Sequence, residues 1–280
     1  MRVTAYVLVA DPNFLGESLR AYYGRVDRIV LSYDESGTSW TGTPLPLDEC
    51  LATIEAIDTE GKCVRAPGHY ARTEQQPLDN ETYQRQQALD AASEGADWVL
   101  QLDTDEVMLD ADRFFRSMER ADATGATALD YPSRWLYARV SPGRYLEAST
   151  RFWRPAASYP GPLAVRAGTT LSLARQADVP IYHVDLRPWN TDPAHHHETV
   201  VHEVVEPDAA VLHYSWVRDH DTIRRKFGWS GHAADYSRPV VYERWARRQQ
   251  HPWRTIAGNP LRRRDWYRLV SVAQPAGEGE

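Results

Sequence analysis

The sequence predicts an α/β fold with a mostly parallel central sheet and helices on both of its faces. Two observations lead to this prediction. Short apolar runs of strand length alternate with segments whose apolar residues recur at helical spacing. Further along, these helical crossovers give way to shorter strand-like runs, and a basic helical extension follows. The 280 residues, 42% of them hydrophobic, suit one main domain with an extension.

The first three strands and two helices follow a strand–helix–strand order. Asn13 is a typical helix cap, and Pro46 precedes the second helix, as prolines often do at helix starts. The predicted elements are a strand at 4–9, a helix at 13–22, a strand at 28–32, a helix at 47–54 and a strand at 62–65. This order is typical of parallel strands joined by helical crossovers.

The fourth strand is followed directly by acidic residues. A helix over 81–94, terminated by Gly95, precedes an apolar strand over 98–102. Asp103, Asp105 and Glu106 come next. Ligands bind at the carboxyl ends of strands in open parallel sheets, so these acids are predicted to border a ligand. Where the chain turns, both aspartates can approach one Mg²⁺ or Mn²⁺ ion, which can also bind diphosphate oxygens and stabilise a departing diphosphate.

The second half predicts shorter elements and a helical end. A helix follows Asp110, strands are expected near 126–131, 135–140 and 210–214, and a basic helix begins near Asp219. The predicted organisation is a catalytic domain at 1–217, with a donor half at 1–109 and an acceptor half at 110–217, a helical extension at 218–273 and a disordered tail at 274–280.

Charge and composition limit the classes of partner. The formal net charge of −7 argues against general nucleic-acid binding, whereas the arginines that gather after residue 218 indicate an anionic ligand or surface. No apolar stretch is long enough to span a bilayer and no basic, apolar leader opens the chain, so we expect a cytoplasmic protein without stable membrane insertion. The oligomeric state is left open.

With these residues in view, the chain resembles the nucleotide-sugar glycosyltransferases of the GT-A fold, particularly family 2-like members. The resemblance runs from residue 1 to about 230 and is most specific in RQQALDAASEGADWVLQLDTDE; the later HEV and LHYSW segments match more loosely. It implies transfer of a hexosyl group from a nucleotide-diphosphate donor to an acceptor hydroxyl, with inversion of configuration. UDP is the expected base because it is the commonest in that family, and the acceptor is expected to be a carbohydrate or small molecule.

The resemblance also implies roles for particular residues. The donor is expected to contact Val9, Ala10, Asp11, Asp34, Arg85, Asp103, Thr104, Arg218 and Lys226. The Mn²⁺ or Mg²⁺ ligands are expected to be Asp103, Asp105 and His213. Glu203 is the first choice for the base that deprotonates the acceptor; Asp185, Glu198 and Asp130 remain alternatives.

Two other functions remain open at this point. A nucleotidyltransferase would share the sheet and the acidic metal site, but it usually has a Gly-rich basic loop after its first strand, and ADPNFLGES is not such a loop. A non-catalytic module could instead bind a carbohydrate or an anion through the aromatic, arginine-rich second half.

Overall fold

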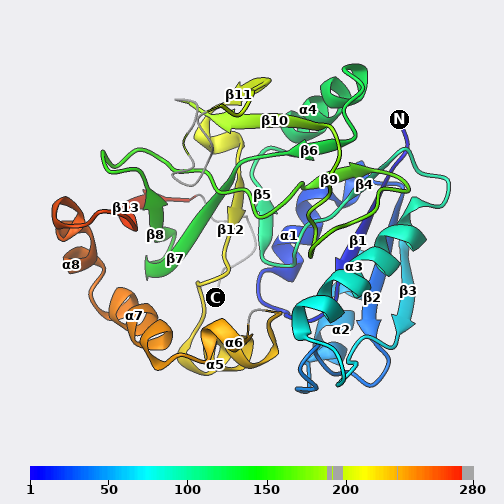
Figure 1. Cartoon of the computed structure of the whole chain (residues 1–280). Coiled ribbons are helices and arrows are strands. Elements are labelled where there is room, and N and C mark those ends of the chain that lie inside the picture. The colour runs from blue at the N-terminus through cyan, green and yellow to red at the C-terminus, as the bar shows by residue number, and fades with distance from the viewer. Residues whose placement is uncertain (188–190, 192–197, 232, 273–280) are drawn as a thin grey trace.

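The computed structural model describes residues 1–187, 191, 198–231 and 233–272. Within these ranges the strands form an eight-stranded sheet and a five-stranded sheet, which lie next to each other (Figure 1). The predicted disordered tail at 274–280 lies outside the described residues.

The eight-stranded sheet is the predicted parallel sheet. All of its neighbouring strands run parallel except one, which is antiparallel to both of its neighbours. In spatial order the strands are β11 (Glu203–Val205), β10 (Ile181–Leu186), β6 (Ala128–Asp130), the antiparallel β9 (Ala164–Arg166), β4 (Trp98–Leu100), β1 (Val3–Leu8), β2 (Arg28–Asp34) and β3 (Cys63–Gly68). The predicted α/β fold with a mostly parallel, Rossmann-like sheet is confirmed.

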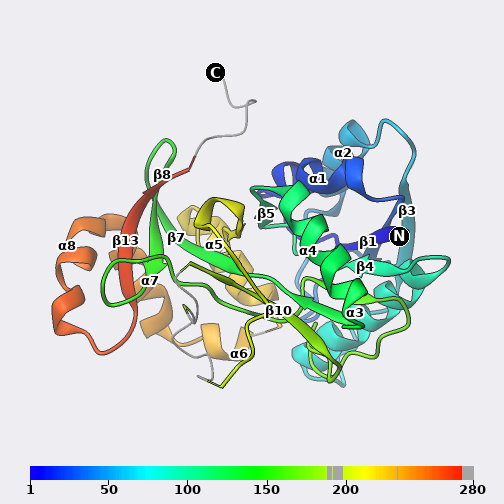
Figure 2. The same cartoon turned by 90° about the horizontal axis from the view of Figure 1, so that it is seen from above.

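Helices cover both faces of this sheet, as predicted. On one face pack α1 (Leu15–Tyr22), α2 (Leu47–Ile57) and α4 (Ala111–Ala123), and on the other α3 (Pro77–Ser93), as Figure 2 shows. Successive strand residues point to opposite faces. Val7 of β1 therefore packs with α1 and α2, whereas Tyr6 packs with α3. The short helix η1 (Tyr23–Arg25) continues α1.

The five-stranded sheet begins where the acidic segment leaves the first sheet. Its order is β13 (Trp266–Ser271), β8 (Arg144–Ser149), β7 (Ser133–Ser141), β12 (Val211–His213) and β5 (Glu106–Met108). Because β4 and β5 belong to different sheets, residues 101–105 carry the chain from one sheet to the other. The antiparallel register of β12 and β5 sets His213 opposite Glu106, beside the acidic turn. The helix η2 (Pro207–Ala209) precedes β12.

The C-terminal segment differs in one respect from the predicted helical extension. It contains α5 (His220–Trp229), α6 (Ala233–Tyr236), α7 (Pro239–Gln250), α8 (Pro252–Ala257) and η3 (Asn259–Leu261). It then ends in β13, which pairs with β8, so the extension at 218–273 is not wholly helical. The Asp219 carboxylate caps α5 by accepting the N–H groups of Asp221 and Thr222. Within the described ranges, no helix is both long and apolar enough to cross a membrane.

Candidate functional site

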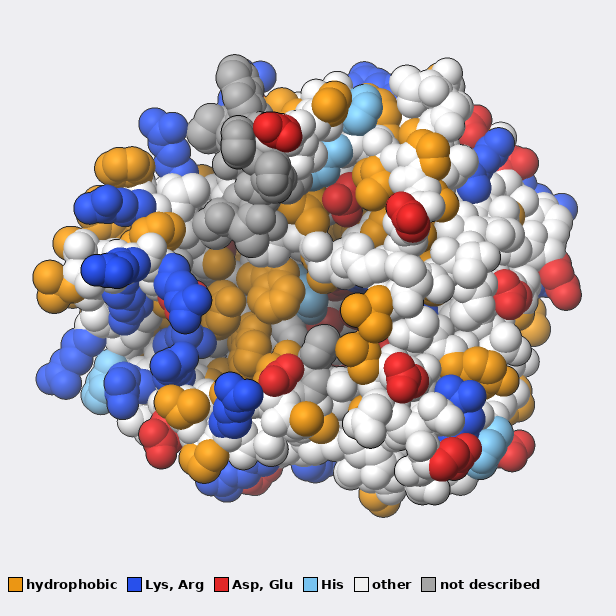
Figure 3. Space-filling model, in the orientation of Figure 1, with side chains coloured by type: hydrophobic (Ala, Val, Ile, Leu, Met, Phe, Trp, Pro, Cys, Tyr) orange, Lys and Arg blue, Asp and Glu red, His pale blue; other side chains and the backbone are white. Residues whose placement is uncertain are grey.

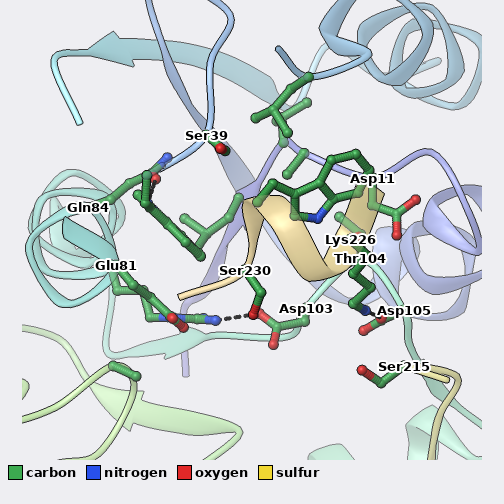
Figure 4. Close-up of a pocket in the computed structure, with 18 of the residues that line it drawn as sticks. Asp11, Ser39, Glu81, Gln84, Asp103, Thr104, Asp105, Ser215, Lys226 and Ser230 are labelled. Atoms are coloured by element: carbon green, nitrogen blue, oxygen red, sulfur yellow. Dashed lines mark hydrogen bonds and ion pairs between the residues drawn. The ribbon is translucent and has the colours of Figure 1, made fainter. Parts of the chain in front are cut away.

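A pocket of about 270 Å³ opens at the carboxyl ends of β1, β2 and β4 (Figure 4). Helix α3 contributes Glu81, Gln84 and Arg85 to its wall, while α5 contributes Lys226 and Trp229. A hydrogen bond of 2.7 Å from the Thr41 hydroxyl to the Gly228 carbonyl ties the loop after β2 to α5. The C-terminal helices thus border a site that the parallel sheet alone would leave open.

The acidic turn presents two of its three carboxylates to this pocket. Asp103 and Asp105 line it, as does Thr104 between them. Glu106 is fully buried and makes a bidentate ion pair with Arg175, at 2.5 and 2.6 Å. It also accepts the Asp103 backbone N–H at 2.9 Å. Glu106 therefore holds the turn in shape, and the other two acids border the pocket.

Asp105 lies at the centre of the charged groups in the pocket. Its Oδ2 accepts bonds from Lys226 Nζ at 2.5 Å and from Arg218 Nη2 at 3.0 Å, and its Oδ1 lies 3.3 Å from His213 Nε2. Burial alone would raise the pKa of Asp105, but the neighbouring Lys226, His213 and Arg218 hold that pKa well below its ordinary value. Arg218 also pairs with Asp11 at 2.9 Å, which places Asp11 in the same network.

Asp103 is held by α3. Arg85 donates to its Oδ1 at 2.8 Å and to Glu81 at 3.0 Å, one turn earlier on the helix. The Asp103 side chain is 31% exposed, against 6% for Asp105. Within the described residues, the buried Nη1 of Arg85 has no hydrogen-bond partner. Arg85 itself lines the pocket, and a guanidinium in such a wall is suited to an anionic oxygen.

The residues present fit a divalent ion in donor type, although no complete cluster is formed. Among residues 1–187, 191, 198–231 and 233–272, no group of three His, Cys, Asp or Glu side chains is placed to hold a metal. Asp105 Oδ1 and His213 Nε2 nevertheless lie 3.3 Å apart, close to the spacing of about 3.0 Å between adjacent ligands of an octahedral ion at 2.1 Å. Asp103 would have to turn toward this pair to join it.

The predicted nucleotide-binding residues lie together, but Asp34 already has partners. Val9 and Ala10 line the pocket beside Asp34. One Asp34 oxygen accepts from the backbone and hydroxyl of Ser36, and the other accepts the backbone N–H groups of Tyr70 and Ala71 at 2.6 and 2.8 Å. These four bonds make Asp34 a clamp between two loops, which leaves it little capacity to read a base or ribose.

Glu203 lies outside the pocket, so the geometry does not support its assignment as the base, which stays a prediction. Its carboxylate pairs with Arg113 and Arg120 of α4, at 2.5 and 2.7 Å, on the edge strand β11. None of the three alternatives lines the pocket either: Asp185 is buried on β10, Asp130 ends β6 and Glu198 is exposed. These residues were chosen from the part of the chain that resembles the family most loosely. That resemblance did not determine where their side chains lie in the fold.

Several pocket residues were missed by the sequence reasoning. They are Trp40, Glu81, Gln84, Arg175, Trp229 and Tyr236. Two of these had a signal in the sequence: Trp40 is a lone tryptophan in a Ser/Thr/Gly-rich loop, and Glu81 precedes Arg85 at the i, i+4 spacing of a helical ion pair. The others come from segments whose approach to β4 depends on the tertiary fold.

Comparisons with known proteins do not identify a family. No family model matches the chain, and no curated protein does. One similar solved structure is a 4-diphosphocytidyl-2C-methyl-D-erythritol synthase from Anaerococcus prevotii DSM 20548, with a TM-score of 0.35, 13% identity, and coverage of 59% of this chain and 70% of that chain. Another is a mannose-6-phosphate isomerase from Helicobacter pylori, with a TM-score of 0.29, 11% identity and coverage of 50% and 52%. At these TM-scores, neither carries an argument about activity.

Proposed function

We propose that this chain is a glycosyltransferase that takes a sugar from a nucleotide-diphosphate donor. One observation carries the proposal. At the carboxyl end of a parallel sheet, Asp103 and Asp105 border a pocket that Arg85 and Lys226 also line. Paired acids with convergent cations at this place suit a diphosphate better than a neutral ligand, because each charge then has an opposite partner.

The binding step follows from the partners seen in the site. Lys226 is bonded to Asp105, and Arg85 has one donor without a partner among the described residues. An incoming diphosphate offers the pocket-lining Arg85 a further acceptor and attracts the Lys226 ammonium away from Asp105. Since Lys226 belongs to α5, the same movement brings this helix over the phosphates and helps to exclude water from them.

A divalent ion is part of the proposal. Mn²⁺ or Mg²⁺ would be held by Asp105 and His213, with Asp103 as a further ligand, and when bound it supplies positive charge to the leaving diphosphate. The chain's own residues prepare this place: Arg218 and Lys226 compensate the Asp105 charge, and Glu106 keeps the turn rigid.

The two ends of the pocket suggest where donor and acceptor bind. Val9, Ala10 and Trp40 offer backbone and an aromatic ring for the nucleobase, for which uracil is the proposed default. Trp135 and Tyr236 line the side formed by β7 and α6. Aromatic faces of this kind can stack on a carbohydrate or small-molecule acceptor whose hydroxyl receives the sugar, with inversion at the anomeric carbon.

Thermal stabilisation tests the donor site. We would compare UDP, GDP, TDP, CDP and ADP, each with and without Mn²⁺, on the wild type and on Lys226→Met. Stabilisation by one diphosphate that depends on Mn²⁺ and is lost in the variant would support the proposal. The sugar donor that carries the stabilising nucleoside diphosphate, for example a UDP-sugar, should then release that nucleoside diphosphate in the presence of an acceptor panel. Release of pyrophosphate from a nucleoside triphosphate would instead indicate a nucleotidyltransferase, and binding without turnover would indicate a binding module.

A further inference from the structure

The loop after β8 exposes two aromatic side chains between two arginines. Phe152 is 74% exposed and Trp153 47% exposed, and Arg151 and Arg154 beside them are exposed as well. The turn is closed by hydrogen bonds between Thr150 and residues 153 and 154. Trp153 adopts a φ of 58°, which is unfavourable for a bulky residue. The backbone therefore holds these rings outward at a local cost.

A second exposed segment lies at the same end of the sheet. In the antiparallel register of β8 and β13, Ser149 is opposite Trp266, so residues 150–154 and 261–265 leave the two strands side by side. Leu261 is 92% exposed, and Arg263 and Arg264 are exposed. We call the two segments together the basic tip; it comprises Arg151, Phe152, Trp153, Arg154, Leu261, Arg263 and Arg264.

The charge around the basic tip is opposite to that of the whole protein. Residues 237–272 contain nine arginines and two acidic residues, a net charge of +7 in a chain of net charge −7. Figure 3 shows Lys and Arg side chains interspersed with hydrophobic ones along the edge of the molecule formed by α7 and α8. Within the described residues, none of the four tip arginines has a carboxylate within 4.0 Å. These cations are free to meet an external anion.

A lipid bilayer matches both properties of this surface. Its phosphates offer partners to the arginines, and the boundary between headgroups and acyl chains just below them accepts Trp, Phe and Leu side chains. A nucleic acid could stack on the rings but offers an aliphatic leucine no comparable environment. The combination of free arginines with exposed aromatic and aliphatic groups therefore favours a membrane surface.

We propose that the basic tip docks the protein reversibly on an anionic bilayer surface. The four arginines contact lipid phosphates, while Phe152, Trp153 and Leu261 enter the boundary between headgroups and acyl chains. Each arginine at such a surface changes partitioning about fivefold. Docking of this kind is peripheral and does not depend on the proposed transferase activity.

Co-sedimentation of the full chain with vesicles tests the proposal. The probes are phosphatidylcholine vesicles with and without 30% phosphatidylglycerol, at low and at high salt. We expect binding only to the anionic vesicles and weaker binding at high salt. The double variant Arg263→Gln/Arg264→Gln should bind about 25-fold more weakly, and Phe152→Ser/Trp153→Ser at least tenfold more weakly. The control Arg116→Gln, which removes an exposed arginine from α4, should bind like the wild type.

Thermal unfolding of each variant separates loss of docking from loss of fold, because these exposed positions should leave the melting temperature unchanged. Three results would overturn the proposal. They are no binding to the anionic vesicles, equal binding to phosphatidylcholine vesicles with and without phosphatidylglycerol, or an equal loss of vesicle binding in the tip variants and in the control variant. Tighter binding to single-stranded RNA than to the anionic vesicles, with the same RNA affinity in the Phe152→Ser/Trp153→Ser variant, would also overturn the proposal. It would indicate a surface that binds polyanions by charge alone.

Discussion

Replacing Asp34 by Asn should destabilise the protein because it turns an acceptor into a donor at a buried site. The side chain is 4% exposed and accepts four hydrogen bonds, two on each oxygen. An asparagine oxygen can serve only one of these pairs, and its amide then faces two N–H or O–H donors. Each buried donor left without a partner costs about 1–3 kcal/mol. We expect a loss of about 3 kcal/mol, or roughly 6–10 °C in melting temperature.

The pH dependence of this effect has a definite sign. Burial would raise the pKa of Asp34, but hydrogen bonds from Ser36, Ala71 and Tyr70 lower it below its ordinary value of 3.8. A depressed folded-state pKa means that the ionised carboxylate stabilises the fold above about pH 4 and that this contribution is lost as the pH falls toward the folded pKa. The difference between wild type and Asp34→Asn should therefore be constant between pH 7 and 5 and narrow below pH 4.

Urea unfolding followed by circular dichroism at pH 7, 5 and 3.5 measures this difference. Glu35→Gln is the matched control, since Glu35 is the exposed neighbour and its replacement should change stability by less than about 0.5 kcal/mol. If Asp34→Asn is no more destabilising than the control, or if the difference does not change below pH 4, the assignment of Asp34 as a charged clamp is refuted.

Three further predictions concern the pocket and its surroundings. Lys226→Met should weaken nucleoside-diphosphate binding at least tenfold in titration calorimetry, whereas Arg224→Met, an exposed position on the same helix, should not. Glu203→Gln should leave turnover within about twofold, because its carboxylate pairs with α4 outside the pocket; a fall of 10²-fold or more would restore it as the base. Asp105→Ala should lower the free energy of unfolding by about 3 kcal/mol in urea, because the buried Arg218 would lose one of its two carboxylate partners and keep Asp11. Unchanged stability would contradict the charge network described here.

The local patterns of the sequence determined the fold class and the position of the acidic turn. Apolar residues on both faces of β1 require cover on both sides, which is why a parallel sheet between helices could be predicted. The motif after β4 likewise needed only the strand pattern and the rule that ligands bind at carboxyl ends. Asp103 and Asp105 line the pocket because that rule depends on chain direction and not on distant contacts.

The tertiary structure alone decided which charges meet. Arg218 and Asp105 are 113 residues apart, and their contact requires β12, β5 and the start of α5 to converge. Glu106 resembles its neighbours in the sequence, yet it turns inward to Arg175, whereas Glu203 is drawn to the arginines of α4. Residues 266–271 form a strand because β8 offers an edge with free hydrogen-bonding groups, in a segment where the sequence indicated only helix. A sequence pattern reports the environment along the chain, but the partner of a side chain is set by how distant elements pack.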